Sequence, residues 1–256
     1  LEFRTCALPI YMECTAMSTK YLGKQFDIHG GGMDLMFPHH ESEICQSQIV
    51  NDTPSAKYWV HNNMITINGQ KMGKSLGNFI TLNQFFSGNH ELLTQAYSPM
   101  TIRFFILQAH YRSTVDFSNE ALQSAQKGFD KLMQAYKTLQ QLKPSATDSA
   151  NMDEVYQRCV DAMNDDLNSA MVIAELFDLT KTINSVKDGH ASLTASSIQC
   201  CKEIFDTFVF GILGLKDESV SDHQEVIDQL MQMILSIRQK AKAEKNWAVS
   251  DQIRNQ

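Results

Sequence analysis

The sequence contains no apolar run long enough to cross a membrane. Its longest candidate, residues 205–215, falls short of the roughly 20 residues that a span needs, and Asp206 interrupts it. The first residues also lack the charged and apolar regions of a signal peptide. We therefore expect a cytoplasmic protein that has no membrane partner.

Cysteines are few and scattered. The 256 residues include six of them, and their spacing has none of the regularity of a disulfide framework. Reduced thiols in a cytoplasmic protein are the expected state. Cys200 and Cys201 are adjacent, so a helix that runs through them should bury one of the two.

Positive charge is also scarce. The net charge of −7 argues against a protein that binds nucleic acid mainly through electrostatics, although a local basic surface is compatible with it. Basic residues near the C-terminus could form such a surface or could equally be a solvated helix face. These residues are Arg238, Lys240, Lys242 and Lys245.

The first part of the chain mixes strand and helix patterns. Residues 26–29 and 58–61 have the apolar character of short buried strands. Residues 64–67 run into an Asn68-Gly69 pair, which is typical of a hairpin turn. Helices are predicted over residues 38–49 and 100–111.

From Ser118 onward the pattern is helical. Ser118 is a suitable N-cap, and a helix behind it could run to Leu142 before Pro144 stops it. The predicted fold class is therefore a mixed α/β nucleotide-binding portion followed by an all-α helical bundle. Further helices are predicted over residues 153–164, 167–186, 193–213 and 223–244.

The segment FDIHGGGMDLMFPHHESE, residues 26–43, carries the most chemistry. Its glycines let a backbone approach a ligand closely, and the helix opening at Pro38 offers free N–H groups to an anion. His39 and Glu43 fall on one helix face, as metal ligands can, although such pairs are more often solvated. His40 is an alternative ligand, but the spacing to Glu43 favours His39.

Other residues relevant to a metal site lie off that helix face. Cys14 offers a soft thiolate from a different part of the sequence. His29 could be a buried core histidine rather than a site residue. Cys45 points about 200° away from Glu43 around the helix, which predicts a packed thiol.

A loop with two lysines follows the predicted hairpin. Residues 71–75, KMGKS, place Lys71 and Lys74 on a flexible segment, where their charges could stabilise a polyphosphate in a transition state. A solvated basic loop explains the same residues equally well.

Together these segments resemble the cysteinyl-tRNA synthetases, a family of class I aminoacyl-tRNA synthetases. The resemblance runs from about Glu13 to the C-terminus, and several motifs in order are far more specific than any one alone. The matching segments are ECTAMS at residues 13–18, residues 26–43, KMGKSLGNF at residues 71–79, AHYRS at residues 109–113 and NDDLNSA at residues 164–170.

The resemblance implies roles for individual residues and says which domain each of the two portions would form. The mixed portion would be the C-terminal half of a Rossmann-like catalytic domain, and the bundle would be of the anticodon-binding type. His29 matches a histidine beside the family's amino-acid pocket. Three protein ligands of the family's active-site zinc are matched by Cys14, His39 and Glu43.

The lysine loop also has a counterpart in the family. Lys74 matches the nucleotide-contacting lysine of the family's KMSKS loop, and Lys71 is its partner, so both are expected to be catalytic. Gly73 stands where many members have Ser. That change removes a hydroxyl and loosens the loop but keeps both charges.

The implied reaction uses L-cysteine, ATP with Mg2+, and tRNA(Cys). The cysteine carboxylate attacks the α-phosphate of ATP, and the resulting cysteinyl group is then transferred to the tRNA. Zn2+ with an open position can bind a thiolate and has little affinity for a neutral hydroxyl, so no editing domain is needed to reject serine. Nothing in the sequence demands a dimer, so a monomer is expected.

The resemblance further implies that part of the family's chain is missing. The family carries, upstream, a HIGH-type motif that binds ATP and a cysteine that is the fourth zinc ligand. We predict a junction segment at residues 1–12, a partial catalytic domain at residues 13–116 and a truncated helical anticodon-side domain at residues 117–256. Such a fragment should be inactive alone, bind zinc weakly and expose strand edges and apolar surface.

Two other functions fit parts of the sequence. A related ligase that joins cysteine to an amino sugar shares the zinc and lysine chemistry, but the long helical region after Ser118 favours a tRNA substrate. A non-catalytic helical RNA-binding module would explain the bundle, yet it leaves the His39–Glu43 and Lys71–Lys74 pairs without a purpose.

Overall fold

The computed structural model describes residues 8–218, 233–234 and 236–239. The chain divides into two compact units, Leu1–Leu215 and Lys216–Gln256, and the account below concerns the first. Most of the helix predicted over residues 223–244 lies outside the described residues, as do Lys240, Lys242 and Lys245. None of the helices that are described combines the length and apolar character needed to cross a membrane.

The N-terminal part contains a pair of parallel strands and two helices. Strand β1, Phe26–Gly32, pairs with β2, Ala56–Asn62, in a register that places His29 opposite Trp59 and Gly31 opposite His61. Helix α2, Glu41–Asn51, lies in the connection between the two strands and packs against helix α1, Leu8–Leu22. The two strands are where the sequence predicts them, but the prediction that they are buried is wrong, since Ile28 and Tyr58 are exposed. Helix α1 is an additional helix that crosses the expected boundary at residue 12.

A second, three-stranded sheet follows. Its strand order is β4-β3-β5, and β3 pairs antiparallel with β4 and parallel with β5. The predicted Asn68-Gly69 turn is present between β3 and β4, with φ angles of 50° and 76° that match a hairpin turn. The elements of this region are β3 Ile65–Ile67, β4 Gln70–Lys71, α3 Leu82–Ser87, α4 Pro99–Leu107 and β5 Val115–Phe117.

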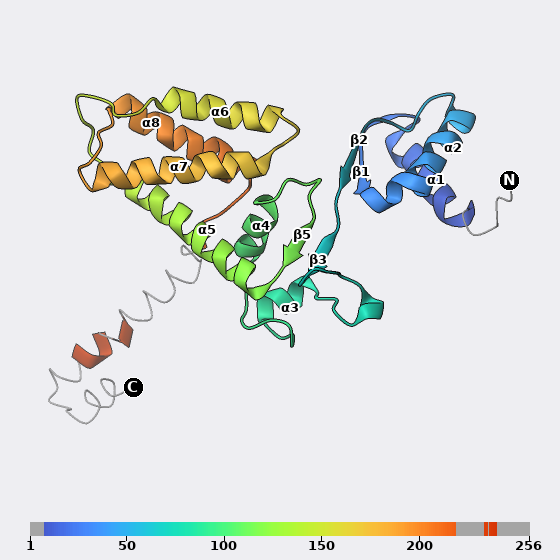
Figure 1. The fold of residues 1–256 in the computed structure, drawn as a ribbon, viewed down its shortest axis with the longest axis horizontal. Helices are drawn as coiled ribbons and strands as arrows, with labels where there is room; N and C mark the ends of the chain where they lie inside the picture. The colour runs from blue at the N-terminus through green and yellow to red at the C-terminus, as the bar shows by residue number, and fades with distance from the viewer. Residues whose placement is uncertain (1–7, 219–232, 235, 240–256) are drawn as a thin grey trace. The chain divides into compact units, whose positions relative to one another are not determined.

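The helical bundle begins where the sequence predicts it. The side chain of Ser118 accepts a hydrogen bond from the Ala121 N–H and so caps α5, Asn119–Leu139. In Figure 1, α6, α7 and α8 lie side by side, and α5 packs against α7 and α8. The remaining helices are α6 Met152–Asn164, α7 Ser169–Lys187, α8 Ala195–Ile204 and a wider helical segment, η4 Phe205–Ile212.

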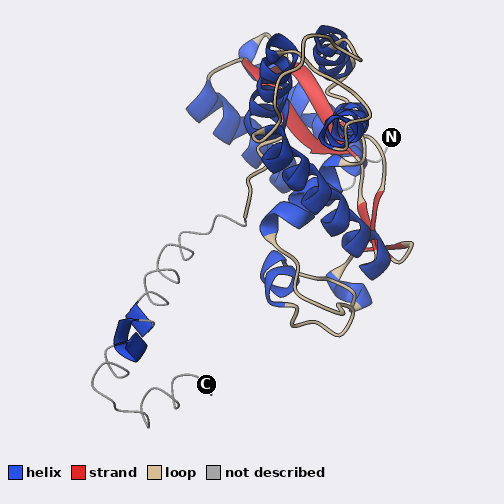
Figure 2. Cartoon of the chain, turned by 90° about the vertical axis from the view of Figure 1, so that its left-hand side faces the viewer, coloured by secondary structure: helices blue, strands red, loops and turns tan. Residues whose placement is uncertain are grey.

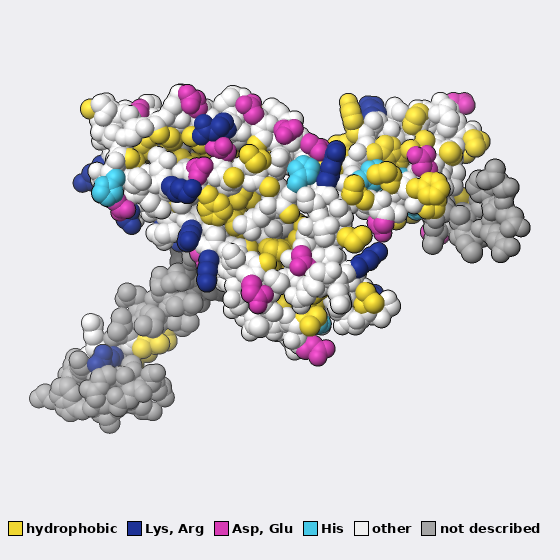
Figure 3. Space-filling model, viewed as in Figure 1, with side chains coloured by type: hydrophobic (Ala, Val, Ile, Leu, Met, Phe, Trp, Pro, Cys, Tyr) yellow, Lys and Arg dark blue, Asp and Glu magenta, His cyan; other side chains and the backbone are white. Residues whose placement is uncertain are grey.

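Apolar side chains are distributed unevenly over these elements. The bundle has an extensive core, which includes Leu176 on α7, Ile204 on α8 and the fully buried Phe104 on α4. Helices predominate, and the strands form two small groups (Figure 2). By contrast, hydrophobic side chains gather on the surface of the part that holds α1, α2, β1 and β2 (Figure 3), where Ile28 and Tyr58 are exposed.

Candidate functional site

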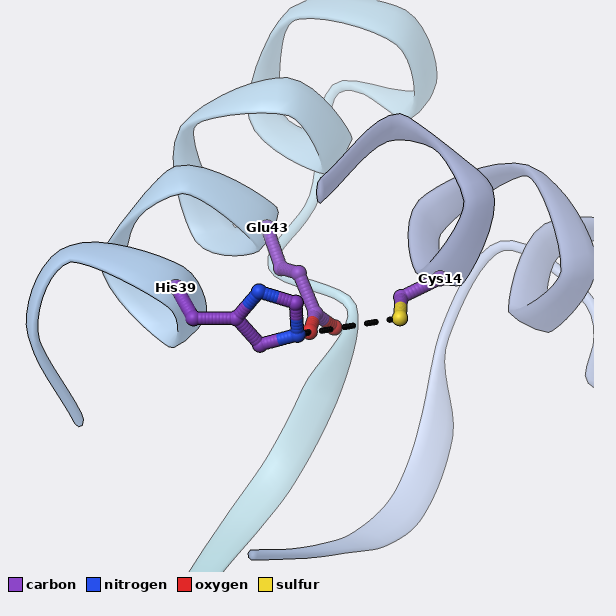
Figure 4. Close-up of side chains that lie close together, drawn as sticks. All are labelled: Cys14, His39 and Glu43. Atoms are coloured by element: carbon purple, nitrogen blue, oxygen red, sulfur yellow. Dashed lines mark hydrogen bonds and ion pairs between the residues drawn. The ribbon is translucent and has the colours of Figure 1, made fainter. Parts of the chain in front are cut away.

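Three potential metal ligands converge from separate elements (Figure 4). Cys14 lies on α1, His39 lies in the turn η2, Met36–His40, and Glu43 lies in the first turn of α2. The Cys14 Sγ is 3.7 Å from the His39 Nε2, which is 3.1 Å from the Glu43 Oε1. All three ligand atoms lie within 4.8 Å of one another.

These distances fit a tetrahedral metal centre. Zinc bond lengths of about 2.3 Å to sulfur and about 2.0–2.1 Å to nitrogen and oxygen, at a tetrahedral angle, separate S and N by about 3.6 Å and N and O by about 3.3 Å. Both Glu43 carboxylate oxygens are buried without a hydrogen-bond partner. A buried carboxylate in this state costs free energy that a cation would recover, so the residues present fit zinc.

The electrostatics of the cluster also favour a cation. Burial raises the pKa of the Glu43 carboxyl to about 7. Burial, followed by the charges of Glu43 and Glu13, raises the pKa of the Cys14 thiol. A bound divalent cation would oppose both effects because it stabilises the carboxylate and the thiolate.

His40, the alternative ligand, has a different environment. Its ring is buried, and its Nδ1 lies 2.8 Å from the Nε2 of His61 on β2. Burial, with the nearby His29, His61 and His39, lowers the pKa of His40 to about 4, so its ring is neutral near pH 7. His40 forms a second possible ligand group with His29 and Glu43; among the described residues, Cys14 belongs to the group that contains His39 and not to this one.

His29 lies beside Glu43 on β1. Its ring stacks on Trp59, with centroids 4.4 Å apart, and its Nδ1 is 3.5 Å from the Glu43 Oε2. Burial lowers the pKa of His29, and the neighbouring His39 and His61 lower it further. His29 also lines a cavity of about 450 Å3 with residues of α1 and β1, among them Met17.

Two residues around this site, Trp59 and His61, were absent from the sequence prediction of its members. Trp59 and His61 stack against each other from alternate positions of β2, and His40 contacts both. Their alternation along a predicted strand was the available signal, since side chains two apart share a face. The pairing of β1 with β2 brings Trp59 and His61 close to His29, and a local sequence pattern does not predict that pairing.

The lysine loop has a defined conformation. Lys71 ends β4, and Lys74 begins the short helix η3, Lys74–Leu76. The Asn78 side chain closes the loop because it accepts from the Gly73 N–H and donates to the Lys71 carbonyl. Lys74 Nζ lies 5.5 Å from the centre of the Phe79 ring.

Both loop lysines are exposed, and within the described part of the chain neither forms an ion pair. Their charges are therefore available to an anion. The structure does not bring them into contact with the Cys14–His39–Glu43 cluster among the residues it describes.

Two of the sequence motifs meet at Asp166. Tyr111 Oη donates to the Asp166 carboxylate over 2.6 Å, and Arg112 Nε lies 3.0 Å from its other oxygen. Asp166 and Leu167 both have φ of 56°, a left-handed conformation that costs free energy in residues other than glycine. AHYRS and NDDLNSA, more than 50 positions apart, thus form one contact.

The comparison with known proteins agrees with this arrangement of motifs. A family model described as tRNA synthetases class I (C) catalytic domain matches residues 9–127, and a DALR domain model matches residues 158–216. The cysteine–tRNA ligase of Parabacteroides distasonis is 60% identical over 248 residues.

This chain belongs to the cysteinyl-tRNA synthetase family.

The family assignment has support from further relatives. The Bacteroides fragilis cysteine–tRNA ligase is 58% identical over 248 residues. Each of these two alignments covers 96% of this chain and 50% of the relative, so the chain spans about half the length of these synthetases.

A solved synthetase structure shares the fold. The LeuRS–tRNA–LeuAMS complex from Agrobacterium radiobacter superposes with a TM-score of 0.55 at 15% identity, covering 73% of this chain and 26% of that one. The predicted fold class, a class I synthetase catalytic portion followed by an anticodon-binding type of helical domain, is confirmed.

The family model and the sequence prediction give different bounds for the catalytic portion. The catalytic family model begins at residue 9 and ends at residue 127, whereas we placed the catalytic portion at residues 13–116; those boundaries remain predictions. Cys45 is exposed, so the prediction of a packed thiol is wrong, because that face of α2 has no covering element among the described residues. Cys201 is buried and Cys200 is not fully so, as predicted.

Proposed function

We propose that this chain is part of a cysteine–tRNA ligase. The enzyme would use ATP with Mg2+ to convert L-cysteine to cysteinyl-adenylate and would transfer the cysteinyl group to tRNA(Cys). The chain alone, half the length of its relatives, would be inactive. We further propose a monomer in the cytoplasm, with a catalytic portion at residues 13–116 and a helical portion at residues 117–256.

The observation that carries this proposal is the convergence of a thiol, an imidazole and a buried carboxylate whose oxygens have no hydrogen-bond partner. Cys14, His39 and Glu43 would hold zinc. When bound, zinc supplies a position that takes a thiolate in preference to a hydroxyl, which separates cysteine from serine. His29, stacked on Trp59 next to Glu43, would line the amino-acid pocket.

The lysine loop would act on the nucleotide. Lys74, with Lys71 as its partner, would contact the ATP phosphates and stabilise the charge of the departing pyrophosphate. The Asn78 side chain holds the loop backbone on both sides of Gly73, so the loop is shaped before ATP arrives. Both lysines act through position and charge, and neither needs to form a covalent bond.

A fusion enzyme tests the proposal. The N-terminal half of the Parabacteroides distasonis relative, joined to this chain, should catalyse ATP–pyrophosphate exchange that depends on cysteine and not on serine. This chain alone should show none. Lys74→Ala in the fusion should lower the exchange rate by about 10²–10³-fold, whereas Lys57→Ala, at an exposed lysine paired with Asp27, should not. A folded, zinc-loaded fusion without cysteine-dependent exchange would contradict the proposal.

A further inference from the structure

A groove between α5 and α7 has the composition of an anion site. Its volume is about 690 Å3. The described residues that line it include three lysines and no acidic residue, in a chain whose net charge is −7. The basic and amide side chains are Gln108, Lys127, Lys131, Gln134, Lys181 and Asn184.

The two lysines of α5 are placed to act together. Lys127 and Lys131 are four residues apart, so their side chains leave the same helix face about 6 Å from each other. Both are exposed, and neither has an ion pair within the described part of the chain. This spacing allows both ammonium groups to reach one phosphate or two consecutive phosphates.

Helix α7 supplies the opposite wall. Lys181 Nζ lies 2.7 Å from Asp178 Oδ1, and both side chains are largely exposed. An exposed pair of this kind contributes little stability, so Lys181 can exchange its partner for a ligand anion at small cost. Asn184, one turn further along, adds an amide donor to the same wall.

The floor of the groove is apolar and aromatic. Gly128 leaves room for Phe177, because a Cβ at Gly128 would come within 3.2 Å of the Phe177 ring and 3.3 Å of the Phe104 ring. Phe177 therefore packs low between the helices and lies in the lining of the groove. An open, basic channel with an aromatic floor suits a strand of nucleotides better than a single small anion.

We propose that this groove binds the phosphodiester backbone of RNA through Lys127, Lys131 and Lys181. The choice of RNA rests on the proposed function. Contacts of this kind fix the position of the RNA on the bundle but do not read its sequence.

Salt dependence of RNA binding tests the proposal. Binding of this chain to a tRNA transcript is measured at several KCl concentrations for the wild type and for Lys127→Glu/Lys131→Glu. The variant should bind about tenfold or more weakly near 0.1 M KCl. Its plot of log affinity against log salt should also be shallower by about 1.5, because each lost phosphate contact removes roughly 0.7–0.9 from the slope.

Two further variants separate position from net charge and from folding. Lys143→Glu/Lys202→Glu makes the same charge change outside the groove and should leave the slope within error of the wild type. Lys127→Gln/Lys131→Gln removes the charges without adding repulsion and should still flatten the slope. Equal losses in the groove and control variants would overturn the proposal, as would a wild type that does not bind the transcript.

A competition experiment distinguishes RNA from a small anion. Inorganic phosphate or ATP at the same phosphate concentration should displace the transcript poorly. If either displaces it as well as unlabelled RNA does, the groove is a small-anion site and the proposal is wrong. Neither measurement uses cysteine or turnover, so failure of the fusion enzyme and failure of the groove are separate results.

Discussion

The ring of His40 occupies the space that a side chain at position 31 would need, and the residue there is Gly31. A Cβ at Gly31 would lie 2.5 Å from His40 Cε1 and 2.8 Å from His40 Nε2. The His40 ring cannot move freely, since it is buried and forms a hydrogen bond with His61. We expect Gly31→Ala to lower the free energy of unfolding by about 1–3 kcal/mol, measured by denaturant titration.

Gly30 provides the matched control. A Cβ there would meet only the Val60 carbonyl oxygen, at 3.7 Å, which is an ordinary contact. Gly30→Ala should therefore leave the free energy of unfolding unchanged or raise it by up to about 1 kcal/mol. Equal destabilisation by the two substitutions would show that the contact with His40 does not cause the loss of stability in Gly31→Ala.

Metal affinity should rise with pH. Below pH 7 both the Cys14 thiol and the Glu43 carboxyl of the metal-free chain carry protons that a cation must displace, because the pKa of Glu43 is about 7. Above pH 7 only the thiol proton remains. Affinity for Zn2+ should increase by about tenfold per pH unit above pH 7 and more steeply below it. In Glu43→Gln the affinity should change less steeply with pH around pH 7 than in the wild type; an affinity independent of pH would contradict the cluster.

The sequence indicated some site residues and left others unseen. The spacing of four positions on one helix selected His39 with Glu43, which is a local property. Cys14 was one candidate thiolate, which the family resemblance then matched to a zinc ligand, because no local pattern joins it to His39, 25 positions away. The roles of His40, Trp59 and His61 depend on strand pairing between β1 and β2, which only the folded chain fixes.

The hairpin that precedes the lysine loop depends on one backbone conformation. Gly69 has φ of 76°, and no heavy atom lies within 4 Å of the position of a Cβ there. A side chain at position 69 would therefore affect stability through the backbone conformation and not through clashes with neighbouring atoms. Gly69→Ala should lower the free energy of unfolding by about 1–2 kcal/mol, measured by thermal and denaturant unfolding.

Gly73, in the same loop, should behave differently. Its φ of −162° is extended backbone that any residue adopts, and the nearest atom to a Cβ is 3.8 Å away. Gly73→Ala and Gly73→Ser should therefore leave the free energy of unfolding nearly unchanged. A loss comparable to that of Gly69→Ala would show that the loop needs glycine at position 73.

Elements with strong local signals were predicted well. The Ser118 cap located the start of α5, and the Asn68-Gly69 pair located the hairpin. Helix α1 was missed because no clear apolar stripe marks residues 8–22. The helix predicted from Pro38 is present, because residues 38–40 belong to the helical segment η2, which continues into α2 at Glu41; the non-helical φ and ψ of Phe37, −132° and 131°, fall just before the predicted start.

The N-terminal part exposes surface that a complete sheet would bury. Strands β1 and β2 form a two-stranded parallel sheet, and Ile28 and Tyr58 on it are 64% and 67% exposed. Parallel sheets are normally covered on both faces. The synthetases that match this chain are about twice as long, so their other half can supply the covering elements. Local patterns could not show this, because burial of a sheet face depends on residues far along the chain.

The claim that Cys14, His39 and Glu43 form a metal centre for the substrate thiol is tested most directly by cobalt spectroscopy. The chain is titrated with Co2+, and L-cysteine or L-serine is then added in the presence of the metal. A thiolate-to-cobalt absorption band should be present and should be lost in Cys14→Ser. The band should persist in Cys45→Ser, the control, which removes an exposed thiol on α2. L-cysteine should strengthen the wild-type band and L-serine should not. A full band in Cys14→Ser, or no response to L-cysteine, would contradict the account.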